Sequence, residues 1–194
     1  LVYSSKDSCL SLYTDPILWQ GPQQLLGEEI KVYMNDSTID WAHIINQALA
    51  VEMNDSIHYN QVTGKEMKAF FRNGEMHQVD VDGNVLCIYY PVEEGDTTLM
   101  MMDYTESSHL RMVLKDRKLE RGAFIGHTTG VVYPMDQIPA DRLRLDAFAW
   151  FDYVRPRSKE DIFEWRGKGA DAVLRKSDRK PIGSARDLNI KRKK

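Results

Sequence analysis

The sequence has few of the patterns that mark disulfide-rich, membrane-spanning or catalytic proteins. Its two cysteines, Cys9 and Cys87, are too few for a disulfide framework. Because Cys87 lies at an apolar position of a strand-like run, we interpret it as a buried thiol, with a disulfide as the alternative. No apolar run approaches the roughly 18 residues of a membrane-spanning helix. The GxSxG nucleophile motif and the phosphate-binding glycine loop are absent as well.

Clustered metal ligands and catalytic carboxylates are also missing. The histidines show no HxxxH pair and no Cys/His metal spacing, and we expect them to be solvated or hydrogen-bonded: His43, His58, His77, His109 and His127. Asp80 and Asp82 share one strand face, as in a weak calcium or glycosidase signal, but a solvated polar face accounts for them better. The sequence therefore predicts a non-enzymatic protein without a metal or a cofactor.

Positively charged residues are scarce in the first part of the chain, and negatively charged residues are scarce in the last part. Residues 1–154 hold 12 Lys and Arg against 23 Asp and Glu, a net charge of −11, whereas residues 155–194 hold 14 against 6, a net charge of +8. An acidic body disfavours nucleic acid, so we predict no nucleic-acid partner. The basic end could contact phosphates, but a solubilising tail or a linker is the simpler interpretation.

In place of catalytic motifs the sequence has a repeated β-pattern. Gln24 to Val51 aligns with Gln61 to Ile88 at a constant offset of 37 residues and without a gap. Five pairs are identical: Gln24/Gln61, Gly27/Gly64, Glu29/Glu66, Lys31/Lys68 and Leu49/Leu86. A third, decayed copy runs from about Tyr104 to Tyr133. Repeats of this length indicate stacked supersecondary units, none of which can bury its apolar face alone.

Within each copy, alternating apolar residues and turn residues predict three short strands. Asn73-Gly74 is a strong two-residue hairpin signal, and Gly83-Asn84 predicts a second turn before a third strand from Val85 to Tyr90. The other copies place turns at Asp36-Ser37, Asn46-Gln47 and Asp116-Arg117. We expect residues 28–133 to be almost wholly strand, with any helix confined to residues after 155.

The two ends of the β-array differ in their protection. We expect Pro134, Pro139 and the segment 141–150 to close the C-terminal end, whereas residues 1–13 leave an unprotected strand edge suited to head-to-tail self-association. The chain has no initiator Met and no signal peptide and begins in mid-pattern, so we expect a processed or shortened chain. The alternative to self-association is that this edge is an artefact of shortening.

Two domains follow from the change in composition near Pro156. Residues 1–157 form the expected β-repeat domain. In residues 158–194, Ser158 and Asp161 resemble a capping box, so a short helix is expected before a basic, poorly ordered tail.

The motifs resemble those of the OstA/LptA family of lipopolysaccharide-transport proteins, and more specifically the OstA-like proteins of the Bacteroidetes. The resemblance covers about residues 1–165, and the second repeat is its most specific part. The matching stretches are Asp15 to Trp19, Gln61 to Phe71, Gly83-Asn84, and Phe148 to Trp150 through Arg155 to Phe163.

This resemblance implies a stacked antiparallel β-jellyroll with a V-shaped groove that carries the acyl chains of lipid A. It also implies a periplasmic location, association with the outer membrane, and lipopolysaccharide and other Lpt-type envelope components as partners. The apolar parity of the strands supplies the candidate groove residues: Ile30, Val32, Ile39, Met67, Ala69, Phe71, Met76, Val81, Leu110, Met112 and Leu114. A closed, dry core would use the same residues.

Two other functions are compatible with the sequence. An interaction scaffold of the same fold would bind no lipid. A carbohydrate-active enzyme on a β-solenoid would need carboxylates clustered in a cleft, for which the sequence offers only Asp80 with Asp82 and Glu28 with Glu29. The residues that line the groove discriminate between these functions.

Overall fold

The fold is known from a computed structural model, which describes residues 1–36, 38–92, 98–116 and 118–163. It consists of β-strands followed by four short 3-10 helices. The strands are β1 (Val2–Ser4), β2 (Cys9–Tyr13), β3 (Ile17–Gln20), β4 (Gln23–Leu26), β5 (Glu29–Met34), β6 (Ile39–Met53), β7 (Tyr59–Arg72), β8 (Glu75–Tyr89), β9 (Met101–Lys115), β10 (Lys118–Ile125) and β11 (Thr129–Pro134). The 3-10 helices are η1 (Met135–Gln137), η2 (Ala140–Arg142), η3 (Asp152–Val154) and η4 (Glu160–Phe163).

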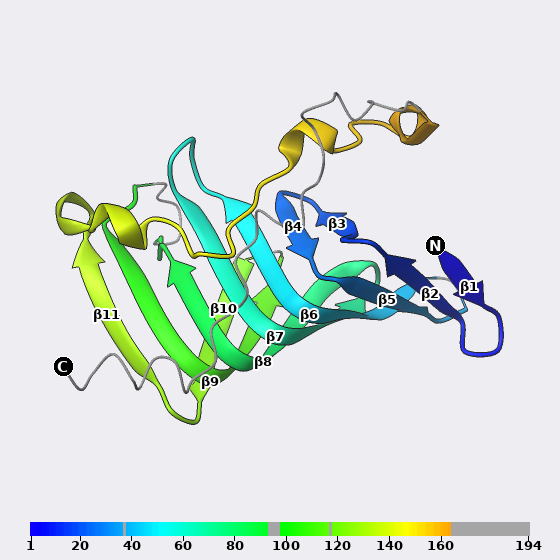
Figure 1. The fold of residues 1–194 in the computed structure, drawn as a ribbon, viewed down its shortest axis with the longest axis horizontal. Coiled ribbons are helices and arrows are strands. Elements are labelled where there is room, and N and C mark those ends of the chain that lie inside the picture. The colour runs from blue at the N-terminus through cyan, green and yellow to red at the C-terminus, as the bar shows by residue number, and fades with distance from the viewer. Residues whose placement is uncertain (37, 93–97, 117, 164–194) are drawn as a thin grey trace.

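All eleven strands belong to one antiparallel sheet that is bent into two walls (Figure 1). Wall A contains β1, β2, β5, the first halves of β6 and β8, the second halves of β7 and β9, and β10. Wall B contains β3, β4, the other halves of β6 to β9, and β11. Each long strand therefore crosses from one wall to the other, and the predicted all-β, LptA-like jellyroll architecture is confirmed.

A line of bends separates the walls, and it corrects one prediction. Gly83 and Asn84 do not end a strand; they form an irregularity inside β8, with φ of 81° and 51°. Asn46 and Gln47 do the same inside β6, with φ of 55° and 49°. Two successive left-handed residues turn a strand sharply while its neighbours continue the hydrogen-bonded ladder on both sides. The expected third strand of each copy is thus the second half of one long strand.

The predicted hairpin at Asn73-Gly74 is confirmed, with φ of 53° and 78° as a type I′ turn requires. The turn at Asp116 lies between β9 and β10, and Ser37, Arg117 and residues 93–97 lie outside the described residues. No helix occurs among the described residues of 28–133, in agreement with the prediction.

Gly27 and Gly64 occupy equivalent positions of the two repeats, and in both places the neighbouring strand approaches the glycine closely. A Cβ on Gly64 would lie 2.4 Å from Cγ1 of Val81, and one on Gly27 would lie 2.5 Å from Cγ2 of Ile44. Both contacts are far shorter than real Cβ contacts, and the opposing atoms are in the packed core. Only glycine lets the neighbouring strand pass the bend at this distance.

Gly64→Ala is therefore expected to destabilise the fold by about 1–3 kcal/mol through overpacking against Val81. Gly122→Ala is the matched control, because a Cβ there would meet nothing within 4 Å, and its effect is expected to stay within ~0.5 kcal/mol. Urea unfolding of the two variants measures the difference. Equal stabilities would show that the bend relaxes around the methyl group.

After β11 the chain crosses the outer face of wall B as a strap, which we define as residues 135–157 (Figure 1). This corrects two predictions. The strap covers a face of the sheet, so β10 and β11 remain edge strands at the C-terminal end. It also contains η1, η2 and η3, so helical turns occur before residue 155. Of these, η1 and η2 directly follow Pro134 and Pro139, because the fixed φ of proline suits entry into a helical turn.

The segment that follows the strap begins as predicted but is short. The Asp161 amide donates to Oγ of Ser158 at 3.3 Å, and the Arg157 amide donates to a carboxylate oxygen of Asp161 at 2.6 Å. These bonds cap η4, a single 3-10 turn. Residues 164–194, which include the predicted basic tail, lie outside the described residues. Among the residues that the structure does describe, no helix is long and apolar enough to cross a membrane.

Candidate functional site

The eleven candidate groove residues come together on the inner face of wall A. Register explains this, because Ile30, Ile44, Met67, Val81 and Leu110 follow one another across β5 to β9 in directly paired positions. All eleven belong to one apolar cluster that fills the space between the walls. Alternation along each strand therefore predicted which side chains share a face.

In this structure most of these side chains are buried. Ile39, Met112 and Leu114 are half-buried, and the other eight are 6% exposed or less. The two inner faces thus pack against each other. Any ligand that lies between the walls must take the place of these contacts, and the three half-buried residues mark where the cluster is open to solvent.

Wall B supplies a second set of inner residues that the sequence interpretation missed. Leu25, Ala48, Val62, Val85 and Cys87 belong to the same cluster as the eleven candidates. They were missed because Gly83-Asn84 was interpreted as a turn, which separated Val85 and Cys87 from the strand that carries Val81. In β8 the alternation of Val79 and Val81 continues across the bend to Val85 and Cys87, and this was the signal that could have found these two residues.

The margin of wall B furthest from the bends is polar on its inner face. We call it the polar lip; its residues are Gln23, Glu52, Asn60, Tyr89 and Asp103. All five are half-buried. Glu52 accepts hydrogen bonds from the side-chain amides of Gln23 at 3.5 Å and Asn60 at 3.3 Å, and the Thr105 hydroxyl donates to Asp103 at 2.7 Å.

The outer face of wall B is held under the strap by two glutamines, the identical pair Gln24 and Gln61. Gln24 donates to the Ala149 carbonyl at 2.9 Å and accepts from the Phe151 amide at 2.8 Å. Gln61 donates to the Leu143 carbonyl at 3.0 Å and accepts from the Leu145 amide at 2.9 Å. Both glutamines are 0% exposed, so each side chain acts as a buried substitute for a neighbouring strand.

Apolar and aromatic contacts complete the attachment of the strap. One cluster joins Leu26, Leu49 and Val51 of wall B to Phe148 and Trp150 of the strap. Another joins Ile88, Tyr90 and Met102 to Leu145. Arginine guanidinium groups also lie 4.5–5.0 Å from aromatic ring centroids at three places along the strap: Arg142 over Tyr104, Arg144 over Tyr59 and Arg155 over Trp19.

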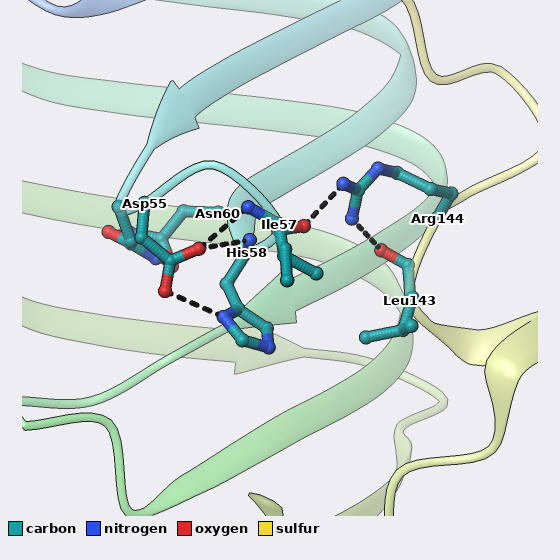
Figure 2. Close-up of polar contacts among 7 residues, drawn as sticks. Asp55, Ile57, His58, Asn60, Leu143 and Arg144 are labelled. Carbon is teal, nitrogen blue, oxygen red and sulfur yellow. Dashed lines mark hydrogen bonds and ion pairs between the residues drawn. The ribbon is translucent and has the colours of Figure 1, made fainter.

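Figure 2 shows how one loop of wall B meets the strap. Arg144 donates to the carbonyls of Ile57 and Leu143, which joins the β6–β7 loop to the strap. In the same loop, Asp55 accepts from the His58 ring at 2.7 Å and from the amides of Ile57 and His58. The hydrogen bond from the His58 side chain is the main reason that the pKa of Asp55 falls to about 2. This loop is ordered by local hydrogen bonds and shows no catalytic geometry.

The carboxylates considered for chemistry lie on the outer face of wall A or at its bend, away from the space between the walls. Asp80 pairs with Arg111 at 2.8 Å, and Asp82 pairs with His109 at 2.5 Å across β8 and β9. Glu28 accepts from Gln47 at 3.0 Å. Asp80 and Asp82 are thus members of cross-strand ion pairs, and Glu28 lies in the connection between β4 and β5. Among the described residues, no group of three His, Cys, Asp or Glu side chains could hold a metal ion.

Both cysteines are free and buried, in agreement with the interpretation of Cys87 as a thiol. Burial raises the pKa of the Cys87 thiol to about 12, and the Asp103 carboxylate adds to this shift. Cys87 is therefore an unreactive core residue.

No family model matches the chain, and no curated protein matches it. In structure the chain is similar to LptH, the LptA-homologous periplasmic component of the lipopolysaccharide transport device of Pseudomonas aeruginosa. The TM-score is 0.50 and the sequence identity 11%, over 69% of this chain and 90% of LptH. At this identity the likeness establishes an LptA-like fold and nothing finer. Membership of the Bacteroidetes-type OstA-like proteins stays a prediction.

Proposed function

We propose that this protein is a non-enzymatic, periplasmic carrier or bridge in lipopolysaccharide transport and outer-membrane assembly, and that acyl chains of lipid A lie between its two walls. The observation that carries the proposal is the joint apolar lining of the two inner faces in an LptA-like fold. An acyl chain needs a continuous apolar surface, and each buried methylene contributes roughly 0.8 kcal/mol.

Three methionines in the cluster support the same function. Met67, Met76 and Met112 have unbranched, flexible side chains, which adapt to partners of irregular shape better than branched ones do. Met112 and Leu114 are also half-buried, so the inner face near β10 needs the least rearrangement to admit a chain.

Met112→Asp is expected to weaken acyl-chain binding at least about tenfold, because a carboxylate on the inner face opposes burial of hydrocarbon. Val113→Asp is the matched control, since the neighbouring residue on β9 is also half-buried but faces outward, opposite Gln78. Native mass spectrometry of protein purified from its own envelope, followed by titration with the lipid found, measures the effect. If Met112→Asp and Val113→Asp bind lipid equally well, acyl chains do not lie between the walls.

An interaction scaffold that binds no lipid is the second candidate, and the close packing of the two inner faces favours it. For a scaffold, mass spectrometry would find no lipid on the unmodified protein. The apolar space between the walls would then be only a hydrophobic core, and the exposed edges of the sheet would be the interaction sites.

Head-to-tail self-association is part of the proposal. Strands β1 and β3 end the walls on one side and β10 and β11 end them on the other, so both ends offer backbone groups for β-augmentation. Leu1, Val2 and Tyr3 are more than half exposed at the first end. Sedimentation velocity over a range of concentrations tests this, and a monomer at all concentrations would contradict it.

A further inference from the structure

The two lips of the space between the walls differ in chemistry. The outermost inner residues of wall A are apolar: Ile39, Phe71, Met76 and Leu114. Those of wall B form the polar lip, which runs across β4, β6, β7, β8 and β9 in paired register. An amphiphile whose chains lie between the walls would therefore meet hydrocarbon on one side of its head and polar groups on the other.

The polar lip is also negatively charged. Glu52 and Asp103 are its two carboxylates, and among the described residues neither lies within ion-pair distance of a lysine, an arginine or a histidine. Their hydrogen-bond partners are neutral: the amides of Gln23 and Asn60, and the Thr105 hydroxyl. The Tyr89 hydroxyl adds a further neutral group to this lip.

The alternation of side chains along each strand, together with their contacts, shows where Glu52 and Asp103 lie. Thr105 and Asp103 are two residues apart on β9 and hydrogen-bond to each other, so they share a face. Thr105 pairs with Cys87, which is in the inner cluster. In the same way Glu52 lies two residues after Ala50 on β6, so the two side chains share a face, and Ala50 packs against that cluster. Both carboxylates thus border the space between the walls.

We propose that the polar lip selects the head of the bound amphiphile, favouring an uncharged, hydroxyl-rich saccharide and disfavouring an anionic group at this position. This inference rests on the proposed function. Carboxylates and amides accept and donate hydrogen bonds to sugar hydroxyls, whereas a phosphate beside Glu52 and Asp103 meets like charge without a compensating cation. Phosphate groups of a larger head are then held away from wall B.

The test compares two single-chain probes of equal length, decyl maltoside and decyl phosphate, both below their critical micelle concentrations. The unmodified protein is expected to bind the maltoside roughly five- to tenfold more tightly, since a like charge a few ångströms away costs about 1 kcal/mol or more. In the double variant Glu52→Gln/Asp103→Asn this preference disappears, mainly because decyl phosphate binds more tightly. Isothermal titration calorimetry at constant ionic strength measures both affinities.

Glu106→Gln is the matched control, because Glu106 lies on β9 but pairs with Leu86 and faces outward, beside Tyr104. It removes one carboxylate charge from the outer face of the same wall and is expected to leave the preference unchanged. If the two probes bind equally, or if Glu106→Gln has the same effect as the double variant, the polar lip does not select the head group. The proposed binding of acyl chains between the walls is then unaffected. If neither probe binds, the proposed function fails and the inference with it.

Discussion

A chain that ends at Pro134 is expected not to fold to a stable monomer, whereas one that ends at Arg157 is expected to fold like the chain of 194 residues. The first truncation removes the strap and uncovers large apolar side chains on the outer face of wall B: Leu26, Leu49, Val51, Tyr59, Ile88, Tyr90 and Met102. Each such side chain contributes roughly 1.5–3 kcal/mol when fully buried, so the loss approaches or exceeds the 5–15 kcal/mol by which domains are stable.

Circular dichroism melting and size-exclusion chromatography of the two truncations measure the outcome. The chain 1–157 is the control, because it retains the contacts described above between the strap and wall B, together with the bond from Arg155 to the Gly21 carbonyl. It also tests the predicted boundary of the β-repeat domain. A well-folded chain of residues 1–134 would mean that the strap is dispensable and that wall B tolerates an exposed apolar outer face.

Replacing both glutamines that hold the strap is expected to have the next largest effect. Gln24→Ala and Gln61→Ala each remove two hydrogen bonds to the strap. The first leaves the Ala149 carbonyl and the Phe151 amide without these partners, and the second leaves the Leu145 amide without its partner and also removes the bond to the Tyr59 carbonyl, whereas the Leu143 carbonyl keeps the bond from Arg144. A buried polar group left unpaired costs about 1–3 kcal/mol, so each substitution should lower the free energy of unfolding by about 2–4 kcal/mol. The double variant should lose roughly the sum, because the two sites hold different parts of the strap.

Gln23→Ala is the matched control for this pair. Gln23 is the residue before Gln24, faces the other side of β4 and makes one long contact, at 3.5 Å, with Glu52. Its replacement should change stability by less than about 1 kcal/mol. Urea denaturation followed by tryptophan fluorescence reports on the strap directly, since Trp150 lies in it and stacks edge-on against Trp19 at 5.3 Å. Equal losses for Gln23→Ala and Gln24→Ala would contradict the role of the buried glutamines.

Local sequence determined the strands and the hairpin. The face that Ile30, Met67, Val81 and Leu110 share follows from period-2 alternation, because successive side chains of a strand point to opposite sides whatever the rest of the chain does. The turn at Asn73-Gly74 was predictable for a similar reason, since few other residue pairs adopt two consecutive positive φ angles easily.

The same local preference could not separate a turn from a bend. Gly83-Asn84 has the positive φ angles that a hairpin turn would also need, and only the neighbouring β7 and β9, which pair on both sides of it, make it a bend in one continuous strand. Backbone preference constrains φ and ψ, but the hydrogen-bond partners of the flanking residues decide whether the chain reverses or continues.

Tertiary structure alone decided the strap and the polar lip. The repeat revealed that Gln24 and Gln61 are equivalent, but the carbonyls and amides that they bind lie 82 to 127 residues further along the chain. Likewise Glu52 and Asp103, each an ordinary polar residue in its own strand, enter one row only through the register of β6 to β9. Alternation fixes the face of a side chain within a strand, whereas its neighbours across the sheet depend on pairings that no local pattern specifies.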